Sequence, residues 1–271
     1  MRESRVKGAL PCRCWRGDRL DLDIERVWRG VAVVGVLAAA FLTGGCGNAG
    51  TLVVGVRSGQ PGLVTRLPDG RYSGFDIEVA QYVARALGYR DDQVVYTLDP
   101  TRADLVVGAT GPAGSRYVAG PYLVTSTDVL VRAGDLSIRR PRDLARKRVC
   151  ATRESAGPLV KRFGTRWRQV FLAEANLPAA CAPLLASGRT DAIVADAPVL
   201  AGLSAQYPGR FRFSGGSLAT EKYGIAAETP ALRDQVEEAL RRMFDDGTWK
   251  RTVIDQLGAL ATRYTTPPSL D

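Results

Sequence analysis

Short apolar runs alternate with stretches of helical periodicity along the chain beyond residue 50. Runs rich in β-branched residues at 51–56, 105–109, 148–152 and 192–194 predict buried strands. Between the first two runs, residues 75–87 carry apolar side chains at helical spacing, with Asp76 near the start. The same periodicity predicts helices at 156–163, 179–187, 197–206, 231–244 and 249–260. This alternation predicts an α/β fold with largely parallel sheets.

An earlier apolar run has a different character. Residues 31–43 are uncharged and apolar, follow Arg26 and Arg29, and precede Gly44, Gly45 and Cys46. A helix of this length spans only about 20 Å, whereas a bilayer core is about 30 Å thick. The run therefore predicts the apolar part of a signal peptide and not a permanent membrane span.

The end of this run, LTGGC at 42–46, resembles a bacterial lipobox. The resemblance implies a signal peptide over 1–45 and an acylated Cys46 that anchors the protein in the lipid bilayer at the outer face of the cell membrane. The match departs from the family pattern, because Leu42 stands four places before the cysteine, where the usual spacing is three. Simple secretion, with Cys46 left near a free terminus, is the alternative.

Composition narrows the possible chemistry. The chain of 271 residues has no histidine, the commonest general base and metal ligand. Ser-His-Asp, Cys-His and histidine–zinc sites are excluded, and we expect no metal and no other cofactor. The net charge is +9, but acidic residues interrupt the basic ones and no aromatic-rich basic motif occurs, so nucleic acid is not an expected partner.

Removal of residues 1–45 leaves Cys150 and Cys181 as the internal cysteines. An even pair in a protein exported to an oxidising compartment predicts a disulfide, with two buried free thiols as the alternative.

An ordered set of motifs covers most of the remaining chain. GFDIEVA at 74–80 resembles the signature of the polar amino-acid family of ABC-transporter solute-binding proteins. Further matches follow in the family's order, over residues 50–264: QPGL at 60–63, AGPY at 119–122, RVC at 148–150, TDAIVAD at 190–196, KYGIA at 222–226 and DDGTW at 245–249. QPGL and the cysteine pair are most similar to glutamate-binding lipoproteins of actinobacteria.

The resemblance implies a two-lobed periplasmic-binding-protein (Venus-flytrap) fold of type II. Lobe 1 would comprise residues 46–122 and 224–271, and lobe 2 residues 123–223. The ligand would lie in the cleft between them, at the C-terminal ends of strands. The protein is expected to be a monomer.

The resemblance also implies roles for residues that match the family's ligand contacts. Arg116 would grip the α-carboxylate of an amino acid, with Thr110 and the backbone of Gly111 nearby. An exposed loop arginine is the alternative. Asp196 would pair with the α-ammonium, although it could equally be the N-cap of the following helix.

In lobe 2, the family supplies backbone N–H groups to the carboxylate from the loop that holds Arg153, Ser155 and Ala156. Glu154 stands where relatives have glycine. Arg57 and Arg153 are the cations near the expected pocket, which favours glutamate or aspartate and leaves glutamine or asparagine as possibilities. Gln60 would add a polar contact or serve only in a turn.

One segment is shorter than the family pattern. Residues 97–103 stand where relatives carry an aromatic clamp and a helix, so one wall of the pocket is expected to be lost. The predicted function is an extracytoplasmic receptor that delivers its amino acid to an ABC permease. A signalling lipoprotein that acts on a membrane partner without transport is the alternative. An enzyme is not expected, since Glu154 and Asp196 are the only acid–base pair available.

Overall fold

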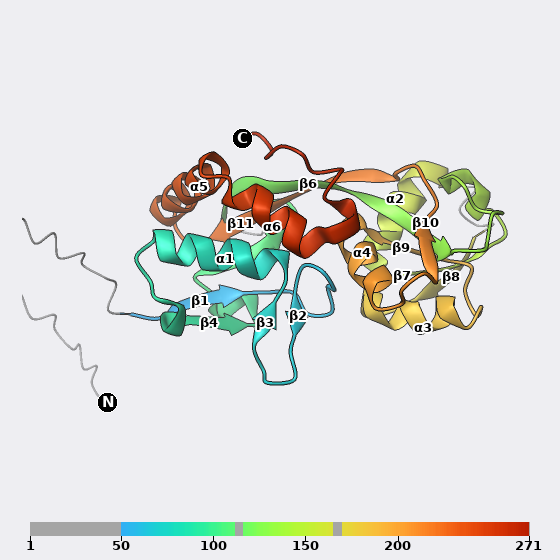
Figure 1. The fold of residues 1–271 in the computed structure, drawn as a ribbon, viewed down its shortest axis with the longest axis horizontal. Helices are drawn as coiled ribbons and strands as arrows, with labels where there is room; N and C mark the ends of the chain where they lie inside the picture. The colour runs from blue at the N-terminus through green and yellow to red at the C-terminus, as the bar shows by residue number, and fades with distance from the viewer. Residues whose placement is uncertain (1–49, 112–115, 165–169, 271) are drawn as a thin grey trace, which may run out of the picture. The chain divides into compact units, whose positions relative to one another are not determined.

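The computed structural model describes residues 50–111, 116–164 and 170–270 (Figure 1). The predicted signal peptide and Cys46 lie outside the described residues. No helix in the described ranges is both long and apolar enough to cross a membrane.

The strands form one mixed sheet and a separate small ribbon. The order in the large sheet is β4-β1-β5-β11-β6-β9-β7-β8, with β10 also paired to β6, and β2 pairs with β3. The strands are β1 (Leu52–Gly55), β2 (Thr65–Arg66), β3 (Tyr72–Ser73), β4 (Val94–Thr97), β5 (Leu105–Ala109), β6 (Tyr117–Arg132), β7 (Arg148–Ala151), β8 (Phe171–Glu174), β9 (Ala192–Asp196), β10 (Phe211–Phe213) and β11 (Ala219–Ala227).

The pairing is only partly parallel, which corrects the prediction of largely parallel sheets. Strand β1 is parallel to β4 and β5, and β7 is parallel to β8 and β9. Between these two parallel sections, β5, β11, β6 and β9 pair antiparallel. The predicted strands all exist. The sequence prediction did not include the long central strands β6 and β11, although 129–131 and 223–227 are buried apolar runs within them.

Strands β6 and β11 belong to both sections of the sheet. The start of β6 and the end of β11 lie beside β5, while the end of β6 pairs with β9 and β10. Figure 1 shows them extending from the section with β1 toward the section with β7 and β9. Residues 123–125 pair with 221–223 midway along. Side chains here lie between the two parallel sections.

Helices cover the sheet where apolar periodicity predicts them. They are α1 (Phe75–Ala86), α2 (Arg153–Phe163), α3 (Cys181–Ala186), α4 (Ala197–Ala205), α5 (Pro230–Asp245) and α6 (Thr248–Leu257), with short 3-10 turns η1 (Asp91–Gln93), η2 (Pro100–Arg102), η3 (Pro141–Leu144), η5 (Pro178–Ala180) and η6 (Gly258–Leu260).

Two helix starts show how local chemistry sets the boundaries. Helix α2 begins earlier than predicted, because the Thr152 hydroxyl caps it by accepting a hydrogen bond from the Ser155 amide at 3.2 Å. Helix α1 follows Gly74, which has φ 123°, and a Cβ there would lie 2.3 Å from the Leu63 carbonyl oxygen. Only glycine fits at this start.

The core contains the predicted disulfide. Cys150 on β7 is bonded to Cys181 on α3, and both residues are fully buried. The bond fastens a helix to the strand that leads into the N-terminus of α2. It therefore supports one side of the cavity described next.

Candidate functional site

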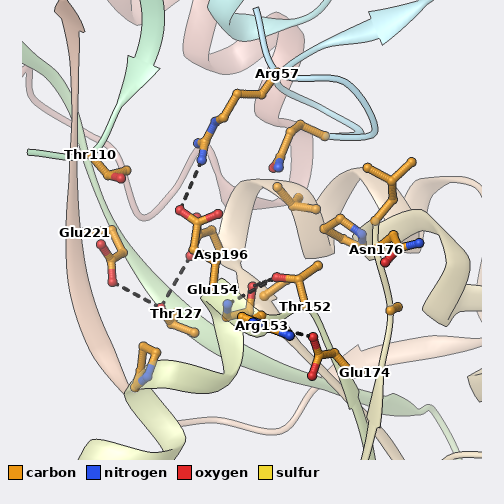
Figure 2. Close-up of a pocket in the computed structure, with 18 residues that line it drawn as sticks. Arg57, Thr110, Thr127, Thr152, Arg153, Glu154, Glu174, Asn176, Asp196 and Glu221 are labelled. Atoms are coloured by element: carbon orange, nitrogen blue, oxygen red, sulfur yellow. Dashed lines mark hydrogen bonds and ion pairs between the residues drawn. The ribbon is translucent and has the colours of Figure 1, made fainter. Parts of the chain in front are cut away.

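A cavity of about 480 Å³ opens where several strands end. This volume lies within the range of small-ligand pockets. Many of its lining residues end a strand or closely follow one, among them Arg57, Thr110, Thr152, Glu174 and Asp196. They come from both parallel sections of the sheet, and Thr127 and Glu221 join them from β6 and β11 (Figure 2). The C-terminal ends of strands are the usual ligand position in open α/β sheets.

The structure brings together six of the nine ligand contacts expected from sequence. These six line the cavity: Arg57, Gln60, Thr110, Arg153, Ser155 and Asp196. Ala156 does not line it, because this residue is buried inside α2. Gly111 lines a separate hollow beside Arg116.

Arg116 is not at this cavity, which corrects its predicted role. Its guanidinium donates to the backbone carbonyls of Pro100 at 2.9 Å and Ala103 at 2.7 Å. A third contact reaches the Asp104 carbonyl at 3.4 Å. The short connection between β4 and β5 forms only one 3-10 turn, and Arg116 binds the carbonyls that this turn presents. These contacts fasten Arg116 to the loop between β4 and β5.

Arg57 is the cation of the first section that does face the cavity. Its Nη1 lies 3.4 Å from Glu154 Oε1, while Nε and Nη2 are buried and have no hydrogen-bond partner among the described residues. The guanidinium lies 5.4 Å from the centre of the Tyr223 ring. Burial acts to lower the pKa of Arg57, but nearby acidic groups, Tyr223 foremost, outweigh it and raise the pKa. Arg57 thus remains charged in the wall of the cavity.

The buried carboxyl group of Asp76 lies close to the Arg57 guanidinium. Asp76 on α1 is 3% exposed and accepts a hydrogen bond from the Tyr122 hydroxyl at 2.8 Å. Burial raises the pKa of Asp76 to about 6, against the opposing effects of Tyr122 and Arg57. Gly108 makes room for this group, since a Cβ there would meet Asp76 Oδ2 at 3.1 Å and Arg57 Nε at 3.5 Å.

Asp196 presents its carboxylate to the same cavity. It stands at the N-cap position of α4, yet its side chain makes no capping hydrogen bond. The Tyr223 hydroxyl donates to Asp196 Oδ2, and the Thr127 hydroxyl lies 3.4 Å from Oδ1. Burial raises the pKa of Asp196 despite these donors. The capping alternative is therefore excluded for this side chain.

Glu221 adds a second carboxylate beside Asp196. Its Oε1 lies 3.5 Å from the Thr127 hydroxyl, so the two acids share one donor (Figure 2). The pKa of Glu221 is raised by burial and then by the charge of Asp196. Sequence reasoning missed Glu221 and Thr127, because only the pairing of β6 with β11 and β9 places them here.

The remaining charged groups lie around α2. Arg153 Nε pairs with Glu174 Oε1 at 3.1 Å, and the arginine side chain is 90% exposed. The lining as a whole contains Arg57 and Arg153 against four carboxylates, a formal charge of −2. Among the described residues, no group of three or more His, Cys, Asp or Glu side chains is arranged to hold a metal ion.

Comparisons with known proteins agree with this architecture. Residues 52–255 match the model of the bacterial extracellular solute-binding proteins, family 3. The chain is 31% identical over 234 residues to the glutamate-binding protein GluB of Corynebacterium glutamicum, covering 77% of this chain and 79% of GluB. The corresponding GluB of Corynebacterium efficiens is 30% identical over the same shares.

A solved structure shows the same fold. An ancestral arginine-binding protein bound to arginine is 26% identical, covers 77% of this chain and 99% of its own, and superposes with a TM-score of 0.67. The predicted α/β two-lobed periplasmic-binding-protein fold is thereby confirmed. The family match spans three quarters of the sequence and includes the strands and helices around the cavity. This chain belongs to the bacterial extracellular solute-binding proteins, family 3.

Proposed function

We propose that this chain is the extracytoplasmic solute-binding lipoprotein of an ABC transporter and that it binds a free α-amino acid in the cavity. One observation carries the proposal: a cation, Arg57, and a carboxylate, Asp196, line the same cavity. An α-amino acid has one carboxylate and one ammonium, and each finds a fixed partner here. Arg57 takes the role that the sequence assigned to Arg116.

The two partners belong to different sections of the sheet. Arg57 follows β1, whereas Asp196 ends β9. A ligand held by both favours a closed arrangement over an open one by its differential affinity. This supports lobe 1 as residues 46–122 with 224–271 and lobe 2 as residues 123–223, with strands β6 and β11 as the hinge.

The proposed lipid anchor at Cys46 rests on the sequence alone. Acylation of Cys46 would hold the protein on the outer face of the cell membrane, where a permease receives the ligand from a monomeric receptor. Replacement of Cys46 by serine should release the protein from the membrane fraction into the medium. Retention of the Cys46→Ser protein in the membrane fraction would oppose lipid anchoring.

The proposal also concerns which amino-acid side chain the cavity accepts. Two relatives are named as glutamate-binding proteins, which supports glutamate or aspartate, as does the presence of two arginines in the lining. Glutamate is therefore one of the first ligands to test.

Binding can be tested by thermal unfolding of residues 47–271 with each amino acid at millimolar concentration. A ligand at 100 times its Kd stabilises the native state by about 2.7 kcal/mol. We expect Arg57→Gln and Asp196→Asn to abolish this stabilisation. The matched control Arg116→Gln should lower the melting temperature itself but preserve the response to ligand. A response lost in Arg116→Gln and kept in Arg57→Gln would refute the site.

A further inference from the structure

We infer that Glu221, beside Asp196, makes this cavity selective for amino acids with a positively charged side chain. The inference rests on the proposed function, since it concerns the ligand of the same cavity. It departs from the names of the relatives that are 30–31% identical.

The first argument is the number of cations available to ligand carboxylates. Arg57 lines the cavity, and its Nη1 lies 3.4 Å from the exposed Glu154, so it can serve one ligand carboxylate. Arg153 is paired with Glu174 at 3.1 Å, and its side chain is 90% exposed. A dicarboxylic amino acid would therefore find Arg57 for one carboxylate, and its second carboxylate would have to displace Glu174 from Arg153.

The second argument is the number of carboxylates that await a cation. Neither Asp196 nor Glu221 forms an ion pair with a basic side chain in the described ranges. Asp196 accepts from the Tyr223 hydroxyl, and the two acids share the single Thr127 hydroxyl hydrogen. The α-ammonium of the ligand satisfies Asp196. Glu221 then remains as a partly buried acidic neighbour that a second positive group would neutralise.

The third argument is the charge of the whole lining. Two arginines and four carboxylates give a formal charge of −2. A cationic amino acid has a net charge of +1 and complements this lining, whereas glutamate has a net charge of −1 and is repelled. Discrimination thus comes from attraction of one class and repulsion of the other, and Glu221 contributes one of the two excess negative charges.

The test is isothermal titration of residues 47–271 with L-arginine, L-lysine, L-ornithine, L-glutamine and L-glutamate. Wild type should bind a cationic amino acid most tightly. Glu221→Gln should weaken that binding about 10- to 100-fold, the value of one hydrogen bond to a charged group, and change glutamine affinity by less than about threefold. Glu228→Gln is the matched control, because it removes an exposed charge just beyond the same strand.

Failure of this inference and failure of the proposed function give different results. Tighter binding of glutamate than of every cationic amino acid, or cationic binding unchanged by Glu221→Gln, would overturn the inference and leave the proposed receptor function intact. If no amino acid binds to a folded wild-type protein, the proposed function fails and this inference fails with it. Melting temperatures without ligand establish that each variant is folded.

Discussion

Asp76 shows how a single buried carboxyl can serve a binding site at a cost in stability. It lies in the first turn of α1, where the helix dipole favours a negative charge, and the Tyr122 hydroxyl donates to it. Burial nevertheless raises its pKa to about 6. Its negative charge is retained next to Arg57, whose guanidinium must keep its position in the cavity wall.

The raised pKa of Asp76 predicts a pH dependence of stability. Between about pH 4 and pH 6 the native state holds a proton that the unfolded state has lost, so this contribution falls as pH rises. A rise of about two units corresponds to about 3 kcal/mol. The unfolding free energy of Asp76→Asn minus that of wild type should therefore increase by about 3 kcal/mol from pH 4 to pH 7, measured by urea denaturation. A difference independent of pH would contradict this assignment.

At the scale of elements, the disulfide fastens α3 to β7 inside the core. The bonded cysteines are 31 positions apart and neither lines the cavity. Closing a loop of this length stabilises the folded state mainly by restricting the unfolded chain. The bond thus contributes stability to the section of the sheet that carries Thr152 and Asp196, while ligand contacts remain with other side chains.

We expect the double variant Cys150→Ala with Cys181→Ala to lose about 3 to 4 kcal/mol of unfolding free energy. Urea denaturation of wild type under reducing conditions should show a loss in the same direction. Ligand affinity of the folded double variant should stay within about threefold of wild type. Unchanged stability would indicate that the reduced chain retains restricting structure when unfolded.

At the scale of the whole described molecule, the C-terminal segment beyond α6 contacts the second half of β6. Arg263 pairs with Asp128 at 2.6 Å, and the Asp128 side chain is 7% exposed. The same guanidinium lies 4.9 Å from the centre of the Phe213 ring. Tyr264 and Thr125 share a hydrogen bond of 2.7 Å. These contacts link a segment that follows the last helix to strands formed much earlier in the sequence.

Replacement of Arg263 by alanine should cost about 1 to 3 kcal/mol, because it leaves the buried Asp128 without its cation. Arg241→Ala removes an exposed arginine whose partner Glu238 is also exposed, and should cost less than about 1 kcal/mol. Urea denaturation of both variants gives the comparison. Equal losses would mean that burial of Asp128 does not set the strength of its ion pair.

Local patterns determined much of this protein. Strand β5 and helix α1 lie where apolar periodicity predicts them. The spacing of apolar residues within one short segment is enough to identify a buried helical face or a buried strand. The disulfide followed from an even pair of cysteines in an exported chain. The resemblance to the solute-binding family implied that Arg57 and Asp196 lie near the ligand, and both line the cavity.

Only the tertiary structure determined which charged side chains lie next to one another. Arg116 has the spacing of a ligand contact, but the carbonyls of a short turn capture its guanidinium. Glu221 lies 25 positions from Asp196 in the sequence, and only the pairing of β6 with both β9 and β11 brings the two carboxylates to Thr127. Periodicity reports which face of an element is buried. It does not report which distant side chains share that face, because strand pairing across the whole chain sets those distances.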